Sequence, residues 1–322
     1  MNEARLFAEE VAAGIMEYFP EDQWIQCRVV ETKKNNNVSR IGLAFHEEGE
    51  SAGPVIYMEP YREAAADGRP MHEIMKEIMG IVSRSRDRTE LIGSLDYGDY
   101  ESVKEYLSVT LVNGRDNRQM LSQMPHRQME DLALILELKF PMEEGIGSVK
   151  VSHELAERWE MDTDALFAQA EKNAVEKEPP CLQRLEETML SLAFGSDAAE
   201  NLLEQELPTP EEVPSQLYVL SNVSKNKGAT VLSYPGVLEK TDKLLPQGFY
   251  ILPSSVHELL IAPKSPEISP KELGEMVRAI NRAEVAKEDQ LSDRVYEYDR
   301  ESGKILQVPE SIRQKETREA AR

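Results

Sequence analysis

The sequence predicts an α+β protein with two mixed domains, in which helices flank largely antiparallel sheets. Segments with helical spacing and segments with strand composition both occur in each half of the 322-residue chain. They do not follow the strict β-α-β alternation of parallel sheets, and short turn sequences join neighbouring strands. A segment rich in proline and glutamate separates the two halves.

The first half begins with a predicted helix over residues 2–18. Phe7, Val11 and Ile15 recur at every fourth position and form one apolar stripe. The three asparagines 35–37 favour a hairpin turn, because their short polar side chains tolerate positive φ. The strands predicted in this half cover residues 24–33, 38–47, 53–58, 108–113, 132–140 and 146–151.

Apolar faces and capping residues predict the other helices of this half. Residues 71–84 place methionine, isoleucine and valine on one broad face. Asp162 caps a helix that the prolines 179–180 end, and residues 182–194 form a further helix. By contrast, the apolar run 132–136 does not alternate, which predicts a strand buried on both faces.

The predicted domain boundary is a segment in which three prolines and four glutamates resist both helix and sheet. It divides the chain into an N-terminal α+β domain over 1–203, a linker over 204–215 and a C-terminal α+β domain over 216–308. A polar tail over 309–322 follows. Each domain is long enough to bury a core of its own.

The C-terminal half contains the clearest helix start in the chain. Ser269 is a suitable N-cap, Pro270 lies where no amide partner is needed, and Glu272 completes a capping box. The other elements predicted here are a helix over 237–245 and strands over 218–222, 249–252, 256–262, 295–298 and 305–308.

Composition limits the classes of function. With 59 acidic against 37 basic residues, the formal charge of −22 disfavours binding to nucleic acid and to anionic membranes. Cys27 and Cys181 are too few for a disulfide framework or a four-ligand zinc site. The chain starts without an apolar signal core, and no segment approaches the roughly 20 apolar residues of a spanning helix. We therefore expect a cytoplasmic protein that binds neither nucleic acid nor membrane.

Separated motifs in one order resemble a known family. The motifs are Pro54-Val-Ile-Tyr-Met-Glu59, Met124-Pro-His126, Tyr218-Val-Leu-Ser-Asn222, Ser233-Tyr-Pro-Gly-Val-Leu238, Phe249-Tyr-Ile-Leu-Pro-Ser-Ser-Val-His-Glu258 and Leu291-Ser-Asp-Arg-Val-Tyr-Glu-Tyr-Asp-Arg300. They are similar to family 5688, a domain-of-unknown-function family of proteins from anaerobic gut Firmicutes. The resemblance covers most of the chain and implies a bacterial intracellular protein, sometimes encoded near mobile elements. Because the family has no established activity, it implies no catalytic residue.

The most enzyme-like cluster is Ser254, Ser255 and His257, since a hydroxyl nucleophile needs a nearby base and a third group to orient that base. In a strand, however, His257 shares a face with Leu259 and Ile261, which favours a packed, hydrogen-bonded histidine. The two serines follow a proline and have the composition of a turn.

Other motifs predict neither a metal nor a cofactor. The remaining histidines are His46, His72, His126 and His153, and none has a second histidine at metal-binding spacing. The glycine pair 145 and 147 lacks the further glycine and the lysine of a phosphate cradle. Residues 225–228 are either an anion contact or, by composition, a solvated loop.

The leading hypothesis is a non-catalytic accessory or regulatory protein that acts through protein contacts. In it, Tyr234, Phe249, Tyr250 and Tyr296 belong to the core or to an interface. Two alternatives stay open. One is a hydrolase that uses Ser255 with His257 and an acid such as Glu258 or Asp293. The other is an acidic decoy, from a mobile element, that imitates nucleic acid.

Overall fold

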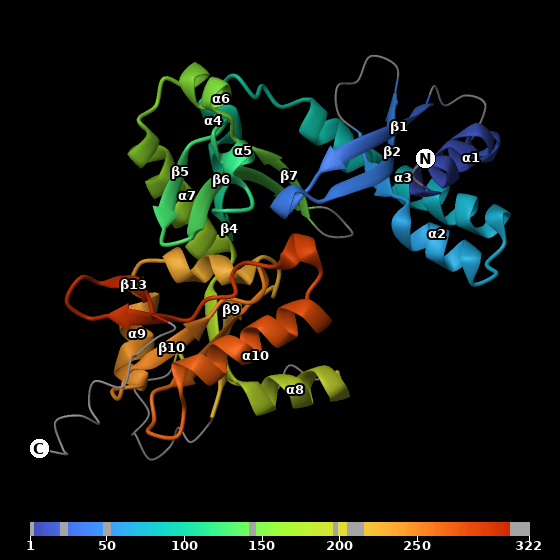
Figure 1. Cartoon of the computed structure of the whole chain (residues 1–322). Helices are drawn as coiled ribbons and strands as arrows, with labels where there is room; N and C mark the ends of the chain where they lie inside the picture. The colour runs from blue at the N-terminus through green and yellow to red at the C-terminus, as the bar shows by residue number, and fades with distance from the viewer. Residues whose placement is uncertain are drawn as a thin grey trace, which may run out of the picture. The chain divides into compact units, whose positions relative to one another are not determined.

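The computed structural model describes residues 3–19, 25–47, 53–141, 146–195, 199–204 and 216–309 (Figure 1). Helices combined with antiparallel strand pairs confirm the α+β class. Across these residues, no helix is both long enough and apolar enough to cross a membrane. Of the predicted linker and tail, all but Glu204 and Pro309 lie outside the described residues.

The chain divides into two compact units, and their bounds differ from those of the predicted domains. The first contains residues 1–106 and 138–149, and the second contains 107–137 and 150–322. Strand β8 (Pro180–Arg184) pairs antiparallel with strand β9 (Tyr218–Asn222), although the predicted linker lies between them in the sequence. Both strands belong to a single six-stranded sheet, which therefore takes strands from both predicted domains.

In the first unit, β1 (Ile25–Lys33), β2 (Ser39–Glu47) and β3 (Val55–Tyr57) form an antiparallel sheet. The predicted asparagine turn joins β1 to β2, with φ of 57° at Asn36 and 56° at Asn37. The turn is confirmed because asparagine tolerates this left-handed conformation.

Helices α1 (Glu3–Ile15) and α3 (Met71–Gly93) place their predicted apolar faces in one core with this sheet. Helices α2 (Glu59–Ala66) and α4 (Tyr100–Val103), which no pattern predicts, complete the described helices of this unit. The buried core residues of the unit are Ala4, Ala8, Val11, Ile15, Phe19, Ile41, Leu43, Phe45, Met58, Ile74, Met75, Ile78 and Val82.

The smaller sheet of the second unit contains β4 (Leu107–Asn113), β6 (Leu132–Pro141) and β5 (His126–Met129), with β7 (Ile146–Lys150) beside β6. The last residues of β6 and most of β7 belong to the first unit. Residues 132–138 of β6, with Glu137 among them, are buried without a break, which confirms the prediction from the apolar run 132–136.

Three helices accompany this sheet. Helix α7 (Thr163–Lys177) packs on β4, and the buried Asn173 donates from Nδ2 to the Leu107 carbonyl at 2.8 Å. Asp162 caps α7 through hydrogen bonds to the amides of the first turn, as predicted. The short helix α5 (Arg118–Leu121) lies in the polar segment 114–123, which has a helical look in the sequence, whereas the short helix α6 (His153–Arg158) is not anticipated by the sequence patterns.

The six-stranded sheet has the order β13-β12-β10-β11-β9-β8. Its remaining strands are β10 (Phe249–Leu252), β11 (Leu259–Pro263), β12 (Tyr296–Asp299) and β13 (Lys304–Gln307), and its helices are α8 (Leu185–Phe194), α9 (Val237–Leu244), α10 (Pro270–Ala283) and the 3₁₀ helix η5 (Gly228–Ser233). The Ser269 hydroxyl accepts a hydrogen bond from the Lys271 amide at 3.2 Å, which confirms the predicted N-cap of α10.

Helix α3 continues to Gly93, nine positions beyond its predicted end at residue 84. Two further predicted boundaries are wrong. The helix expected over 182–194 begins only at Leu185, because the preceding residues pair with β9 as an edge strand. The strand expected over 256–262 begins at Leu259, because Ser255 forms a β-bridge with Gln290 and the chain bends before it joins the sheet. The last correction changes the setting of His257.

Candidate functional site

The residues that the sequence singles out, Ser254, Ser255, His257 and Glu258, lie in the loop between β10 and β11. Both serines are buried. The Ser255 hydroxyl accepts a hydrogen bond from the His257 backbone N–H at 3.0 Å. The Ser254 carbonyl accepts one from the Leu291 amide at 3.1 Å. The serines thus anchor the loop, in line with their turn composition.

The prediction that His257 packs on a strand face beside Leu259 and Ile261 is wrong. Those two residues are fully buried, whereas 38% of the His257 side chain is exposed in the bend before β11. Its Nε2 lies 3.6 Å from Asp289 Oδ1, and its Nδ1 accepts a hydrogen bond from the Lys227 amide at 3.3 Å. In the described part of the chain, no seryl oxygen bonds to the ring, so a nucleophile, base and acid are not assembled here.

The surroundings of His257 favour a proton on Nε2. The Lys227 amide occupies Nδ1 as a donor, which fixes this tautomer. The nearby Asp289 carboxylate raises the pKa of His257 above its ordinary value, and its effect outweighs the partial burial that lowers this pKa. The charge of the half-buried Glu258 acts in the same direction as Asp289. A half-exposed imidazole beside a carboxylate is the geometry of a surface ion pair.

The segment 225–228 is not the solvated loop that its composition predicts. Lys227 Nζ lies 2.8 Å from Oε2 of Glu137, whose side chain is only 2% exposed. The same oxygen accepts a hydrogen bond from the Thr110 hydroxyl at 2.9 Å. A Cβ on Gly228 would lie 2.5 Å from the His257 carbonyl oxygen, so the backbone passes too close for any side chain. This region is therefore held by dense packing and a buried carboxylate.

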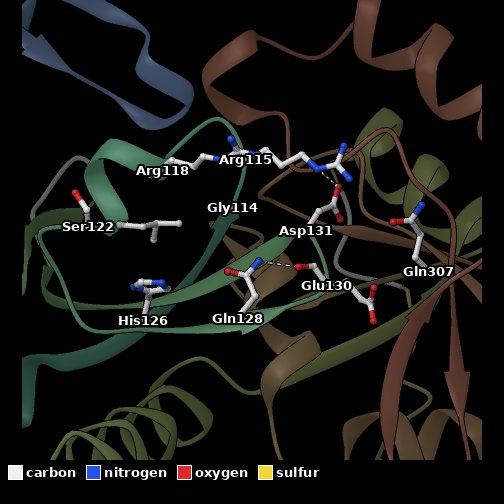
Figure 2. Close-up of a pocket in the computed structure, with 10 residues that line it drawn as sticks. Gly114, Arg115, Arg118, Ser122, His126, Gln128, Glu130, Asp131 and Gln307 are labelled. Atoms are coloured by element: carbon white, nitrogen blue, oxygen red, sulfur yellow. Dashed lines mark hydrogen bonds and ion pairs between the residues drawn. The ribbon is translucent and has the colours of Figure 1, made fainter.

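Two polar cavities meet elsewhere in the second unit, at Asp131 in the turn between β5 and β6. The larger measures about 530 Å³ and the smaller about 280 Å³, and both are lined by Arg115 and Asp131. Figure 2 shows the larger one, in which the Arg115 guanidinium points toward the Asp131 carboxylate. We call the two together the Asp131 pocket.

The Asp131 carboxylate is nearly buried, with a side-chain exposure of 9%. It accepts hydrogen bonds from the hydroxyl of Tyr296 and from the Ser292 hydroxyl, the latter at 3.2 Å. Arg115 Nε lies 3.9 Å from the same carboxylate. Burial, and then the bond to Asp131, raises the pKa of the Tyr296 phenol, so this phenol stays a hydrogen-bond donor. The carboxylate is thereby fixed in one orientation at the wall of the pocket.

Asn281 on α10 lines the smaller cavity and is 3% exposed. Its Nδ2 donates to the Ser292 carbonyl at 3.3 Å and to Asp293 Oδ1 at 2.7 Å. Both partners are acceptors, so the orientation of the amide is defined. Its Oδ1 is buried and has no hydrogen-bond partner among the described residues. A buried acceptor without a donor is costly, and such groups in native proteins are nearly always satisfied by water or a ligand.

The charges around the smaller cavity have both signs. Three arginines and three aspartates line it: Arg115, Arg278, Arg294, Asp116, Asp131 and Asp293. A pocket of this kind can receive an anionic group and a hydrogen-bond donor at the same time. Over the described residues, no group of three or more His, Cys, Asp or Glu side chains is placed to hold a metal ion.

The fold and the pocket define an α+β protein whose second unit encloses a polar, mixed-charge cavity. Over residues 4–300 the chain matches DUF5688, a family of unknown function, and it belongs to that family. No curated protein and no solved structure matches it.

Of the residues that line the Asp131 pocket, the sequence singled out His126, as a lone histidine, and Asp293, as a possible acid for His257, but not Arg115, Asp131 or Asn281. Arg115, Asp131 and Asn281 lie on segments that are far apart in the chain. One signal was available, since Ser292 and Tyr296 fall in the motif 291–300 that resembles the family. Tyr296 was assigned there to the core or an interface, and it is fully buried.

Proposed function

We propose that this is a cytoplasmic bacterial protein without catalytic activity, which acts as an accessory or regulatory factor by binding another protein. The observation that carries the proposal is an exposed apolar face on helix α8. Its large side chains, Met189, Leu190 and Phe194, are 62%, 57% and 78% exposed. We call these residues, with the exposed Ala193, the α8 face.

One side of α8 departs from an ordinary surface helix, which turns its apolar residues inward. Here the polar Thr188 and Ser191 are buried, while Met189, Leu190 and Phe194 face solvent. Leu190 and Phe194 are four positions apart and Met189 and Ala193 likewise, so all of them share one contiguous surface. A contiguous exposed apolar patch is typical of an interaction site, whereas single exposed apolar residues are not.

The charge of the chain favours a partner of opposite sign. Glu186 is exposed and lies one turn before Met189 on the same side of the helix. Two copies of a chain with a net charge of −22 repel one another, which disfavours self-association through this face. We therefore propose a partner with an apolar groove and a basic rim, which receives α8 in the helix-in-groove mode.

The geometry of the His257 loop favours the non-catalytic proposal over a hydrolase. The Ser255 hydroxyl is engaged by the backbone of its own loop, and neither ring nitrogen of His257 is directed to a seryl oxygen. The acidic-decoy hypothesis rests on net charge alone and gains no support from the α8 face.

The test compares full-length protein with the variants Phe194→Asp and Leu190→Asp. The control is Leu306→Asp on β13, where an apolar side chain is 41% exposed at another site. A partner protein that the tagged chain captures is purified. The Kd of its complex with each variant is then measured by calorimetry at low and high salt. Each α8 variant should weaken binding at least tenfold, since truncated interface anchors typically cost about 2 kcal/mol.

Support requires that the control binds like wild type and that affinity falls with salt, as a basic rim predicts. The proposal is overturned if all three variants bind equally well. It is also overturned if light scattering shows a dimer of this chain that Phe194→Asp dissociates, because the occupant of the α8 face is then a second copy.

A further inference from the structure

We propose that the Asp131 pocket binds a small zwitterion, an α-amino acid, whose ammonium group lies at Asn281 and whose carboxylate lies at Arg115. This goes beyond the protein-binding function proposed above and uses none of the α8 face. It assigns a ligand class to the buried Oδ1 of Asn281, a residue that lines the smaller cavity, because this oxygen has no donor among the described residues.

The first step is the requirement for a donor. Asn281 Oδ1 is buried and unpartnered, while the Nδ2 of the same amide is already bound to two acceptors. If the amide were flipped, its oxygen would face these two acceptors, and both hydrogen bonds would be replaced by repulsive oxygen–oxygen contacts. Asp131 and Asp293 line the same cavity and add negative charge. An ammonium group offers three donors and a positive charge, which fits both features.

The second step is the requirement for an anion. Arg115 lines both cavities, and its side chain is 50% exposed. Its contact with Asp131 is long, 3.9 Å between Nε and Oδ2, and a guanidinium has five N–H donors. Donors therefore remain for a bidentate bond to a carboxylate. Arg118 on α5 lines the larger cavity as well and offers a second guanidinium to an anion, beside the exposed Glu130.

The third step is rigidity and size. Tyr296 and Ser292 hold the Asp131 carboxylate, and the hydroxyl oxygens of those two residues lie 2.9 Å apart. The wall is thus fixed before a ligand arrives, which lowers the entropic cost of binding. The smaller cavity, which Asn281 lines, measures about 280 Å³ and is at the lower limit of small-molecule sites. This size fits a small metabolite rather than a nucleotide or a peptide.

The experiment uses the full chain and the L-amino acids as probes. Binding is measured first by the shift in Tm and then by calorimetry. The best ligand is compared with its decarboxylated amine and with its deaminated acid. Each of these should bind at least tenfold more weakly, because hydrogen bonds to charged groups are stronger than those between neutral groups.

Two variants locate the site. Arg115→Gln should weaken the amino acid at least tenfold and leave the amine unchanged. Asn281→Leu should abolish binding, and if it does not fold, Arg115→Gln alone decides. The matched control is Arg300→Gln, an arginine 55% exposed and paired with Asp242 outside the pocket, which should bind like wild type.

The inference is overturned if no amino acid gives a Tm shift or heat at millimolar concentration, in which case water alone satisfies Asn281. It is also overturned if the amine or the acid binds as well as the amino acid, or if Arg115→Gln and Arg300→Gln bind equally. Phe194→Asp should retain ligand binding, so failure of this inference and failure of the proposed α8 interaction are distinguishable.

Discussion

The His257 loop and the Asp131 pocket both place a titratable side chain beside a carboxylate, yet they are built differently. In the His257 loop the ion-paired side chains of His257 and Asp289 are half exposed, and it is the backbone at Gly228 that is tightly packed. In the Asp131 pocket the side chain of Asn281 is buried and that of Asp131 nearly so, and Asn281 keeps an acceptor without a partner among the described residues. Residue type alone would select the first region. Burial together with an unsatisfied group beside a cavity selects the second.

The largest effect expected is that of Gly228→Ala, which tests whether backbone packing holds the His257 loop. The new Cβ would lie 2.0 Å from Ser221 Oγ and 2.5 Å from the His257 carbonyl oxygen. We expect a loss of about 3 kcal/mol in the free energy of unfolding, measured by urea denaturation. Adding Ser221→Ala should recover only part of it, because the carbonyl contact remains. Full recovery in the double variant would show that the backbone is not the constraint.

The next effect concerns the buried network of the Asp131 pocket. Tyr296→Phe removes a donor from the Asp131 carboxylate, and we expect a loss of about 2 kcal/mol in unfolding free energy. Tyr298→Phe is the matched control on the same strand, where the ring stacks on Phe249 and is only half buried. It should change stability by less than about 0.5 kcal/mol. Equal losses in the two variants would mean that the hydrogen bond from Tyr296 to Asp131 adds no stability of its own.

The same network predicts a difference at alkaline pH. In the unfolded chain Tyr296 ionises near pH 10, whereas in the folded protein its pKa is raised by burial and by Asp131. The stability from Tyr296 is therefore complete below pH 10 and declines as the pH rises above it. The free energy of unfolding, measured by urea denaturation, should fall more for wild type than for Tyr296→Phe. The difference should be about 1 kcal/mol between about pH 10 and about pH 11. If the stability of the two proteins falls in parallel with pH, folding does not raise the pKa of Tyr296.

The smallest effect belongs to the pair of His257 and Asp289. Because the pKa of His257 is raised, the pair contributes stability below pH 6.5, and the contribution is lost as the pH rises through the folded pKa. The two side chains are 38% and 37% exposed, so screening keeps this contribution under about 1 kcal/mol. NMR titration should give a pKa above 6.5 for wild type and a lower one for Asp289→Asn. A wild-type pKa at or below 6.5 would show that the ion pair of His257 and Asp289 does not stabilise the protein.

Patterns along the chain sufficed for elements that depend on neighbouring residues. The apolar stripe of α1, the turn at Asn36 and the N-cap at Ser269 each follow from residues within a few positions of one another. The continuous burial of β6 also followed from local composition. The start of α8 could not be predicted in this way. The residues of its predicted first turn pair instead with a strand more than thirty positions later, as Leu182 does with Leu220.

The amino-acid sequence alone was enough to establish the α+β class, the acidic character and the family resemblance, because periodicity, composition and motifs are properties of the linear chain. The candidate site required the folded molecule. Asp131 meets Tyr296 across 165 positions, and Asn113 donates to the Leu291 carbonyl across 178. Whether Asn281 Oδ1 finds a donor depends on which groups surround it in space. Hydrogen-bond satisfaction between distant segments is a property of packing, and no local pattern encodes it.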